Sequence, residues 1–226
     1  MKKLVGLIAL LALFSCSNSG QNNNSTDNCD NKAKYGKIDI CLPIIDGMKE
    51  CYSLPNVKEY ADRFGQEASI LLAFYINDET YEQVSMINEL TFDDYFRISG
   101  AKSLADAEAG QFHLNKMADM VESNYFKKHW SEIKNNVEKY FDNISFGQPV
   151  LIDSYSPHTD IRTFILLIKF QGEDFEYVMI SSSNMMLIKE RLIYLNYYKL
   201  YDGEESVKNL KAKNDYMVLR LMDENF

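Results

Sequence analysis

The last third of the chain limits the possible fold most strongly. After Gly147, four consecutive segments have the residue pattern of strands, and only short turn-forming stretches separate them. Parallel neighbours need crossover connections of roughly a dozen residues or more, so connections this short require antiparallel neighbours. The sequence therefore predicts an antiparallel meander of four strands, over residues 150–155, 162–171, 174–188 and 191–201.

Two further strands are expected earlier in the chain. Residues 38–42 alternate as a strand that ends at Pro43, and Asp46-Gly47 after it is a hairpin signal. Residues 70–76 are a continuous apolar run rich in strand formers. The sequence thus predicts an N-terminal hairpin and one buried strand in addition to the meander.

Amphipathic helices are expected to flank these strands. A helix is expected over 56–64, after Pro55, and helical spacing of apolar residues predicts helices across 114–141. The acidic residues within 202–205 suit the first turn of a last helix. Capping-box patterns predict helix starts at Thr91 and Ser103. A sheet with segregated helices is an α+β architecture, which is the fold class we expect.

The start of the chain has the order of an export signal. Lys2 and Lys3 precede an apolar run over 4–14, which is too short to cross a membrane. Residues 13–16, Leu-Phe-Ser-Cys, resemble the lipobox of bacterial lipoproteins, which implies that a diacylglyceryl group is attached to Cys16 before cleavage. The alternative is an ordinary signal peptide followed by an accidental cysteine.

This resemblance divides the chain into three parts. Residues 1–15 are expected to be a signal peptide. Between Cys16 and Ala33 the chain has no apolar residue except Cys29, so residues 16–35 are expected to form a disordered tether. No Pro, Gly or Ser-rich break, charge block or repeat interrupts residues 36–226, which we expect to form a single α+β domain.

Charge and the residue after the lipobox bear on location. The net charge of −9 argues against a nucleic-acid partner, which needs a basic surface, and leaves the acyl chains on Cys16 to hold the protein at membrane lipid. Ser17 resembles the default signal for the outer membrane, where Asp would resemble an inner-membrane retention signal. We therefore expect an outer-membrane anchor, with the domain facing the periplasm.

Three cysteines remain after Cys16, and an oxidising compartment predicts one disulfide and one free thiol among them. All three pairings of Cys29, Cys41 and Cys51 are open. A three-residue loop over 45–47 would place Cys41 opposite Cys51, whereas a two-residue turn would point Cys41 to the other side. A Cys41–Cys51 bridge therefore depends on register, and the alternative is that Cys41 is a small buried hydrophobe.

No motif for catalysis, a cofactor or a metal stands out. The three histidines lie far apart and no Cys-x-x-Cys occurs, so no metal site is expected. Ser154 or Ser156 with His158 and Asp160 contains the residue types of a catalytic triad, but these residues are too close in sequence to be positioned independently. The acidic pairs, Asp93-Asp94 and Glu204-Glu205, are explained by helix starts.

Tyrosines recur along the last predicted strand: Tyr194, Tyr197, Tyr198 and Tyr201. Such a row can line a groove for a peptide or glycan, because each ring offers an apolar body and a polar tip. The alternative is packing within the sheet, since aromatic residues are common strand formers.

The order of elements, with local stretches such as Leu42-Pro43 and Asp46-Gly47-Met48, resembles the α/β/α sandwich of PsbP-type proteins. That fold is used by non-enzymatic accessory factors, and the whole chain also resembles small envelope lipoproteins. The lipobox, the polar tether and the absence of a catalytic motif favour a lipid-anchored, non-catalytic protein that binds a partner, such as an envelope protein or glycan, or assists assembly. The alternatives are an envelope hydrolase and a glycan- or peptide-binding module, each with a site assembled from distant residues.

Overall fold

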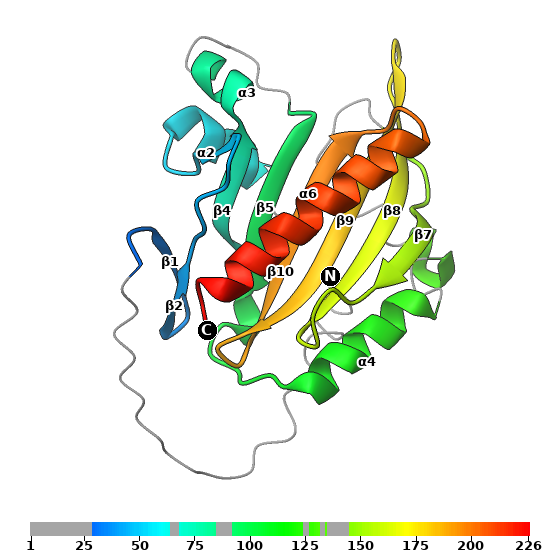
Figure 1. Cartoon of the computed structure of the whole chain (residues 1–226). Helices are drawn as coiled ribbons and strands as arrows, with labels where there is room; N and C mark the ends of the chain where they lie inside the picture. Colours follow the sequence, from blue (N-terminus) through cyan, green and yellow to red (C-terminus); the bar gives the residue numbers. More distant parts are fainter. Residues whose placement is uncertain (1–28, 64–67, 85–91, 124–126, 132–133, 135–144) are drawn as a thin grey trace.

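The computed structural model describes residues 29–63, 68–84, 92–123, 127–131, 134 and 145–226 (Figure 1). Its main sheet contains β3 (Met48–Glu50), β4 (Ser69–Asn77), β5 (Asp94–Ala101), β6 (Ser145–Phe146), β7 (Val150–Tyr155), β8 (Ile161–Gln171), β9 (Glu176–Ile188) and β10 (Arg191–Leu200). The strand order is β3-β4-β5-β10-β9-β8-β6, with β7 also pairing with β8. Every neighbouring pair is antiparallel.

The predicted meander is present. β7, β8, β9 and β10 follow one another through short turns, and each pairs with the next. The turn between β9 and β10 consists of Lys189 and Glu190, with φ of 48° and 58°. Positive φ at both positions matches the right-handed twist of the strands in a two-residue hairpin. The α+β fold class is therefore confirmed.

Helices cover both faces of the sheet. α6 (Glu204–Asp223) lies across one face and packs on β9 and β10, as Figure 1 shows. α4 (Gln111–Glu122) packs on β8 and β9 from the opposite face. On that same face, α2 (Pro55–Arg63) packs on β4 and β5. Because strand side chains alternate, Leu195 joins the core beneath α6 whereas Leu192 joins the cluster beneath α4.

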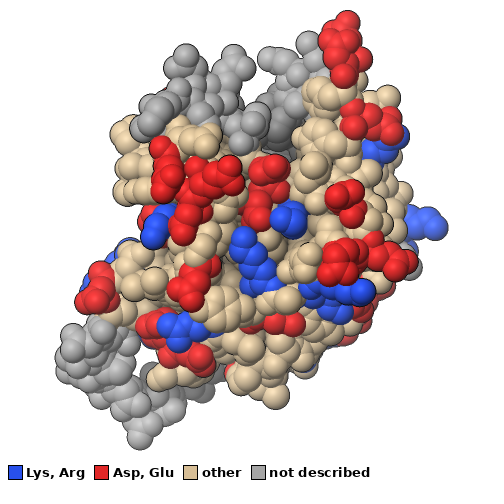
Figure 2. Space-filling view, turned by 45° about the horizontal axis from the view of Figure 1, so that its top comes forward, with Lys and Arg blue, Asp and Glu red and all other residues tan. Residues whose placement is uncertain are grey.

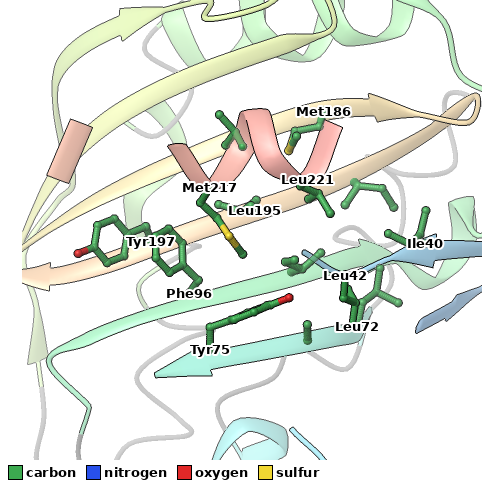
Figure 3. Close-up of a cluster of buried hydrophobic side chains, with 14 of the residues drawn as sticks. Ile40, Leu42, Leu72, Tyr75, Phe96, Met186, Leu195, Tyr197, Met217 and Leu221 are labelled. Carbon is green, nitrogen blue, oxygen red and sulfur yellow. The ribbon is translucent and has the colours of Figure 1, made fainter. Parts of the chain in front are cut away.

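The core beneath α6 joins segments that are far apart in the sequence (Figure 3). Phe96 of β5 and Tyr197 of β10 stack with 4.0 Å between ring centroids and an interplanar angle of 13°. Met217 and Leu221 of α6 belong to the same cluster. The other side chains labelled in Figure 3 are Ile40, Leu42, Leu72, Tyr75, Met186 and Leu195.

A buried polar network fixes α6 on the sheet. Asn214 of α6 accepts hydrogen bonds from Ser182 (2.5 Å) and from the Asn184 amide (2.7 Å), and its own amide donates to Asn184 (3.1 Å). Asn184 also accepts from Thr163 and donates to the Leu195 carbonyl. Since these buried groups pair with one another, shifting α6 along the sheet would leave several of them unsatisfied.

Two predicted helix starts are wrong. The capping-box pattern at Thr91 is followed by strand β5, whose Asp94 side chain bonds to lysines instead of capping a helix. After Ser103 there is only the short 3-10 turn Lys102–Leu104, and α4 begins later, at Gln111. Within the expected helical stretch 114–141, residues 127–131 and 134 are helical beyond α4, and most of the rest lies outside the described residues.

The N-terminal hairpin differs from the expected one. β1 (Lys32–Tyr35) pairs with β2 (Ile38–Cys41) in a separate two-stranded sheet, through a turn at Gly36, where φ is +57°. The hydroxyl of the fully buried Tyr35 donates to a carbonyl of β5. The expected disordered tether over 16–35 is therefore wrong for residues 29–35, and 16–28 lie outside the described residues.

Cys29 and Cys41 form a disulfide, with 5.8 Å between their Cα atoms, and Cys51 is a buried free thiol. The Cys41–Cys51 bridge considered from the sequence is thus wrong. The Asp46-Gly47 turn is present, but β3 after it pairs with β4 and not with β2. That pairing carries Cys51 away from Cys41, while β1 brings Cys29 toward it.

Candidate functional site

The four tyrosines considered as a ligand surface do not share one surface. Tyr197 is buried beneath α6, and Tyr201 packs against the same core. Tyr194 packs against α4 on the opposite face, and Tyr198 stacks on a ring of β5 with 4.9 Å between centroids. Neighbouring residues of a strand point to opposite faces, so this alternation divides the row and leaves its rings in packing contacts.

The residues of the considered triad are not arranged for nucleophilic catalysis. The Ser154 hydroxyl donates to Glu122 of α4 (3.1 Å), not to an imidazole. His158 Nδ1 accepts the backbone N–H of Asp160 (3.2 Å) and lies 3.6 Å from its carboxylate. These contacts close a local loop and provide no activated hydroxyl.

A shallow polar pocket of about 370 Å³ lies where β5 begins and β10 ends, beside α3 (Asp78–Gln83). Its lining residues come from these three elements and their ends: Asn77, Glu79, Thr80, Asp93, Asp94, Lys199 and Leu200. Figure 2 turns this end of the molecule toward the viewer and shows basic side chains surrounded by acidic ones. The pocket is thus a charged depression at one end of the sheet.

The centre of this charged end consists of one carboxylate shared by two lysines. Asp94 accepts from the Lys199 ammonium at 3.0 Å and from the Lys213 ammonium at 3.1 Å, each through a different oxygen. Antiparallel pairing places Lys199 opposite Asp94, and α6 carries Lys213 across the sheet to the same point. The Asp94 side chain is 16% exposed, so the pair of contacts is partly shielded from water.

The electrostatics follow from this arrangement. Burial by itself would raise the pKa of Asp94, but the charges and hydrogen bonds of Lys213 and Lys199 outweigh burial and hold that pKa below its ordinary value. Burial, with the Asp94 carboxylate next to it, raises the pKa of the Tyr197 hydroxyl. The Lys213 ammonium lies 5.4 Å from the centre of the Tyr197 ring. The three charged groups carry a net charge of one positive unit.

The charged and amide groups of this pocket can bind a polar ligand. The described residues contain no group of three His, Cys, Asp or Glu side chains suited to hold a metal ion. Acidic Glu79 and Asp93 line the same pocket as Lys199. An open, polar, mixed-charge surface of this kind fits recognition of another polar surface.

Two signals for this cluster are present in the sequence, although stronger local patterns obscure them. Lys199 lies two residues after the buried Tyr197, so strand alternation places it on the same face. Lys213 lies between Leu210 and Met217 on the helix, next to the buried stripe of α6. The expected helix start at Asp93-Asp94 conceals the role of Asp94 as their shared partner.

Comparisons with known proteins add little. No protein-family model matches the chain, and no curated protein sequence matches it. Among solved structures, the Ran-binding protein Mog1p of Saccharomyces cerevisiae is similar at a TM-score of 0.30 and 9% identity, over 80% of this chain and 84% of that chain. In the described part of the chain, no helix is both long and apolar enough to span a membrane.

Proposed function

We propose that the chain is a lipid-anchored protein of the cell envelope whose domain binds a partner or assists assembly, without catalysing a reaction. The lipobox at residues 13–16 supplies the anchor, at Cys16. The observation that carries the proposal is the Cys29–Cys41 disulfide, which lies just after the polar stretch that follows Cys16. Structural disulfides persist in oxidising compartments, so this bond supports export through the signal at residues 1–15.

The charged end of the sheet supports a binding role. The pocket beside Asp94 is shallow and polar, whereas sites for catalysis are usually enclosed and hold a positioned acid, base or nucleophile. A surface of this kind suits contact with another macromolecule of the envelope.

The anchor is tested by changing Cys16 to Ala in the full chain. Without the thiol no diacylglyceryl group can be attached, so the protein is expected to leave the membrane fraction. Cys51→Ala is the matched control, because it removes a buried thiol and leaves the anchor in place, and it should remain in the membrane. A Cys16→Ala protein that stays in the membrane pellet after a salt wash would contradict the proposal.

The finer location is proposed from Ser17. We expect an outer-membrane anchor with the domain facing the periplasm, and Ser17→Asp should move the protein to the inner-membrane fraction. Protease added to intact cells should leave the chain whole, while protease added after disruption of the outer membrane should cut it. Digestion in intact cells would place the domain on the cell surface instead.

A further inference from the structure

The hairpin between β8 and β9 projects beyond the end of β10, and β6 pairs with β8 as far as Gln171 (Figure 1). Pairing between β9 and β10 ends at Met179 with Leu200, whereas pairing between β8 and β9 continues to Gln171 with Glu176. The turn that follows spans residues 172–175. It lies at the end of the sheet opposite β1, β2 and the C-terminus of α6.

Aromatic side chains form a row that runs up this hairpin. Phe146 meets Phe170 edge to face at 4.9 Å, and Phe170 stacks on Tyr177 at 5.1 Å and 9°. Tyr177 in turn stacks on Phe175 at 5.6 Å and 25°. The row begins with a buried ring and ends with rings that are 36% and 43% exposed, those of Tyr177 and Phe175.

The last ring of the row is held in place, although it is exposed. The Phe175 ring covers Gly172 so closely that a Cβ at that position would overlap it. The Gly172 N–H also donates to the Phe175 carbonyl (2.9 Å), which closes the turn. A ring that is already ordered loses little conformational entropy on binding, and pre-ordered aromatic side chains are typical anchors of protein interfaces.

The charges around the ring indicate the chemistry of the partner. Glu173 and Asp174 are exposed in the turn, and within the described part of the chain neither forms an ion pair. Glu176 is paired with Lys169 at 2.8 Å. An exposed aromatic ring flanked by two free carboxylates is complementary to an apolar cleft with Lys or Arg at its rim.

Other surfaces fit less well. An anionic membrane surface would repel Glu173 and Asp174. The edge strand β7 also exposes apolar side chains, but Pro149 precedes it and its pairing with β8 is irregular between Leu151 and Asp153. A proline and a bulge are features that protect sheet edges from pairing with another strand.

We propose that the β8–β9 turn, with Phe175 as its anchor and Glu173 and Asp174 as its rim, docks into an apolar, basic-rimmed cleft of another envelope protein. The proposal rests on the proposed function, because an anchor at residue 16 attaches the chain through the β1–β2 end and leaves the turn at the far end of the domain. Binding would bury the exposed rings and neutralise two free carboxylates.

The test is photocrosslinking in cells with the full chain, in which Phe175 is replaced by the photoreactive benzoylphenylalanine. Tyr216, equally exposed on α6, is replaced in the control. We expect a protein adduct at position 175 and none at 216, with the crosslinked partner peptide lying beside Lys or Arg residues. The double variant E173K/D174K should lower the yield of this adduct at least tenfold while its melting temperature stays unchanged.

Each other outcome overturns the docking proposal. These outcomes are the absence of a protein adduct, an adduct with lipid or glycan, equal adducts at both positions, and a yield that charge reversal leaves unchanged. Membrane fractionation of the same cells separates the two proposals. A protein that stays in the membrane but gives no adduct contradicts docking alone, whereas a protein found in the soluble fraction contradicts the anchor.

Discussion

The two ends of the sheet are built from different kinds of contact. At the β1–β2 end, a disulfide, a buried tyrosine and Asn225, which follows α6, join segments that are far apart in the sequence. At the opposite end, the contacts include the partly shielded ion pairs of Asp94, a shallow pocket and stacked rings that reach solvent. Buried and covalent contacts stabilise a fold, while exposed ones contribute little to stability and stay available for binding.

Asn225 illustrates the first kind of contact. Its side-chain oxygen accepts the N–H of Cys41 (2.9 Å), and its amide donates to the carbonyls of Cys41 (2.9 Å) and Leu221 (2.8 Å). The residue is 6% exposed, so these bonds are shielded from water. Through the disulfide, Cys29 is therefore linked to a strand that is hydrogen-bonded to the residues just after α6.

Among the changes that compare the two ends of the sheet, the largest effect is expected from removing the disulfide. The Cys29→Ser/Cys41→Ser double variant should lose about 3 kcal/mol of unfolding free energy, because the bond closes a loop of sequence separation 12 in the unfolded chain. Urea unfolding of residues 29–226 measures this, with and without a reducing agent. Cys51→Ala is the control: it should keep the sensitivity to reduction, which the double variant should lack. A double variant as stable as the parent would show that the bond does not constrain this end.

The next effect is expected at Asn225. Asn225→Ala leaves the N–H and carbonyl of Cys41 without partners in a buried position, so it should cost about 1–3 kcal/mol. The neighbouring Glu224, paired with Arg220 on the surface, is the control, and Glu224→Ala should cost less than about 0.5 kcal/mol. If the two variants lower the free energy of unfolding in urea by the same amount, Asn225 is not hydrogen-bonded to β2 in solution.

A domain cut to begin near Lys37, where the sequence pattern places its start, would lose β1 and the buried Tyr35. Sequence reasoning misses β1 because its four residues, Lys-Ala-Lys-Tyr, have no strand pattern of their own. The disulfide and the packing of Tyr35 on distant strands hold these residues in their strand conformation. No local sequence pattern indicates such long-range contacts.

Elements with strong local patterns are predicted well. The meander follows from short turns and strand-forming residues, and α6 follows from an apolar stripe that begins after acidic residues. The start of β5 is missed because Thr91 and Asp94 imitate a capping box, while its true partners, β4 and β10, are decided by long-range pairing. The Asp94 cluster forms only when β5 pairs with β10 and α6 lies across the sheet. The sequence by itself therefore indicates only that Lys199 and Lys213 lie on the buried sides of their elements.

A smaller, pH-dependent effect is expected at the opposite end of the sheet. Asp94→Asn removes the shared partner of Lys199 and Lys213 and should cost about 1–2 kcal/mol at neutral pH. The pKa of Asp94 is lowered in the folded state, so its contribution is present above the unfolded pKa of about 4 and is lost as the pH falls through the folded pKa. The difference between parent and variant should therefore be full above about pH 5 and shrink below about pH 4.

Asp93→Asn is the matched control for this effect. Asp93 is exposed and lies next to Asp94 in the same pocket, so its variant should change stability by less than about 0.5 kcal/mol at any of these pH values. If the two variants have the same pH profile in urea unfolding, the carboxylate of Asp94 does not hold the two lysines together.

The smallest effect on stability is expected at the turn between β8 and β9. Phe175→Ala removes a ring that is 43% exposed and contacts chiefly Tyr177 and Gly172, so the free energy of unfolding should fall by less than about 1 kcal/mol. Phe96→Ala, in contrast, removes a fully buried ring from the core beneath α6 and should cost about 3–5 kcal/mol. A large loss of stability in Phe175→Ala would mean that the ring supports the fold of the hairpin. A small loss would agree with the proposed role of the ring in binding.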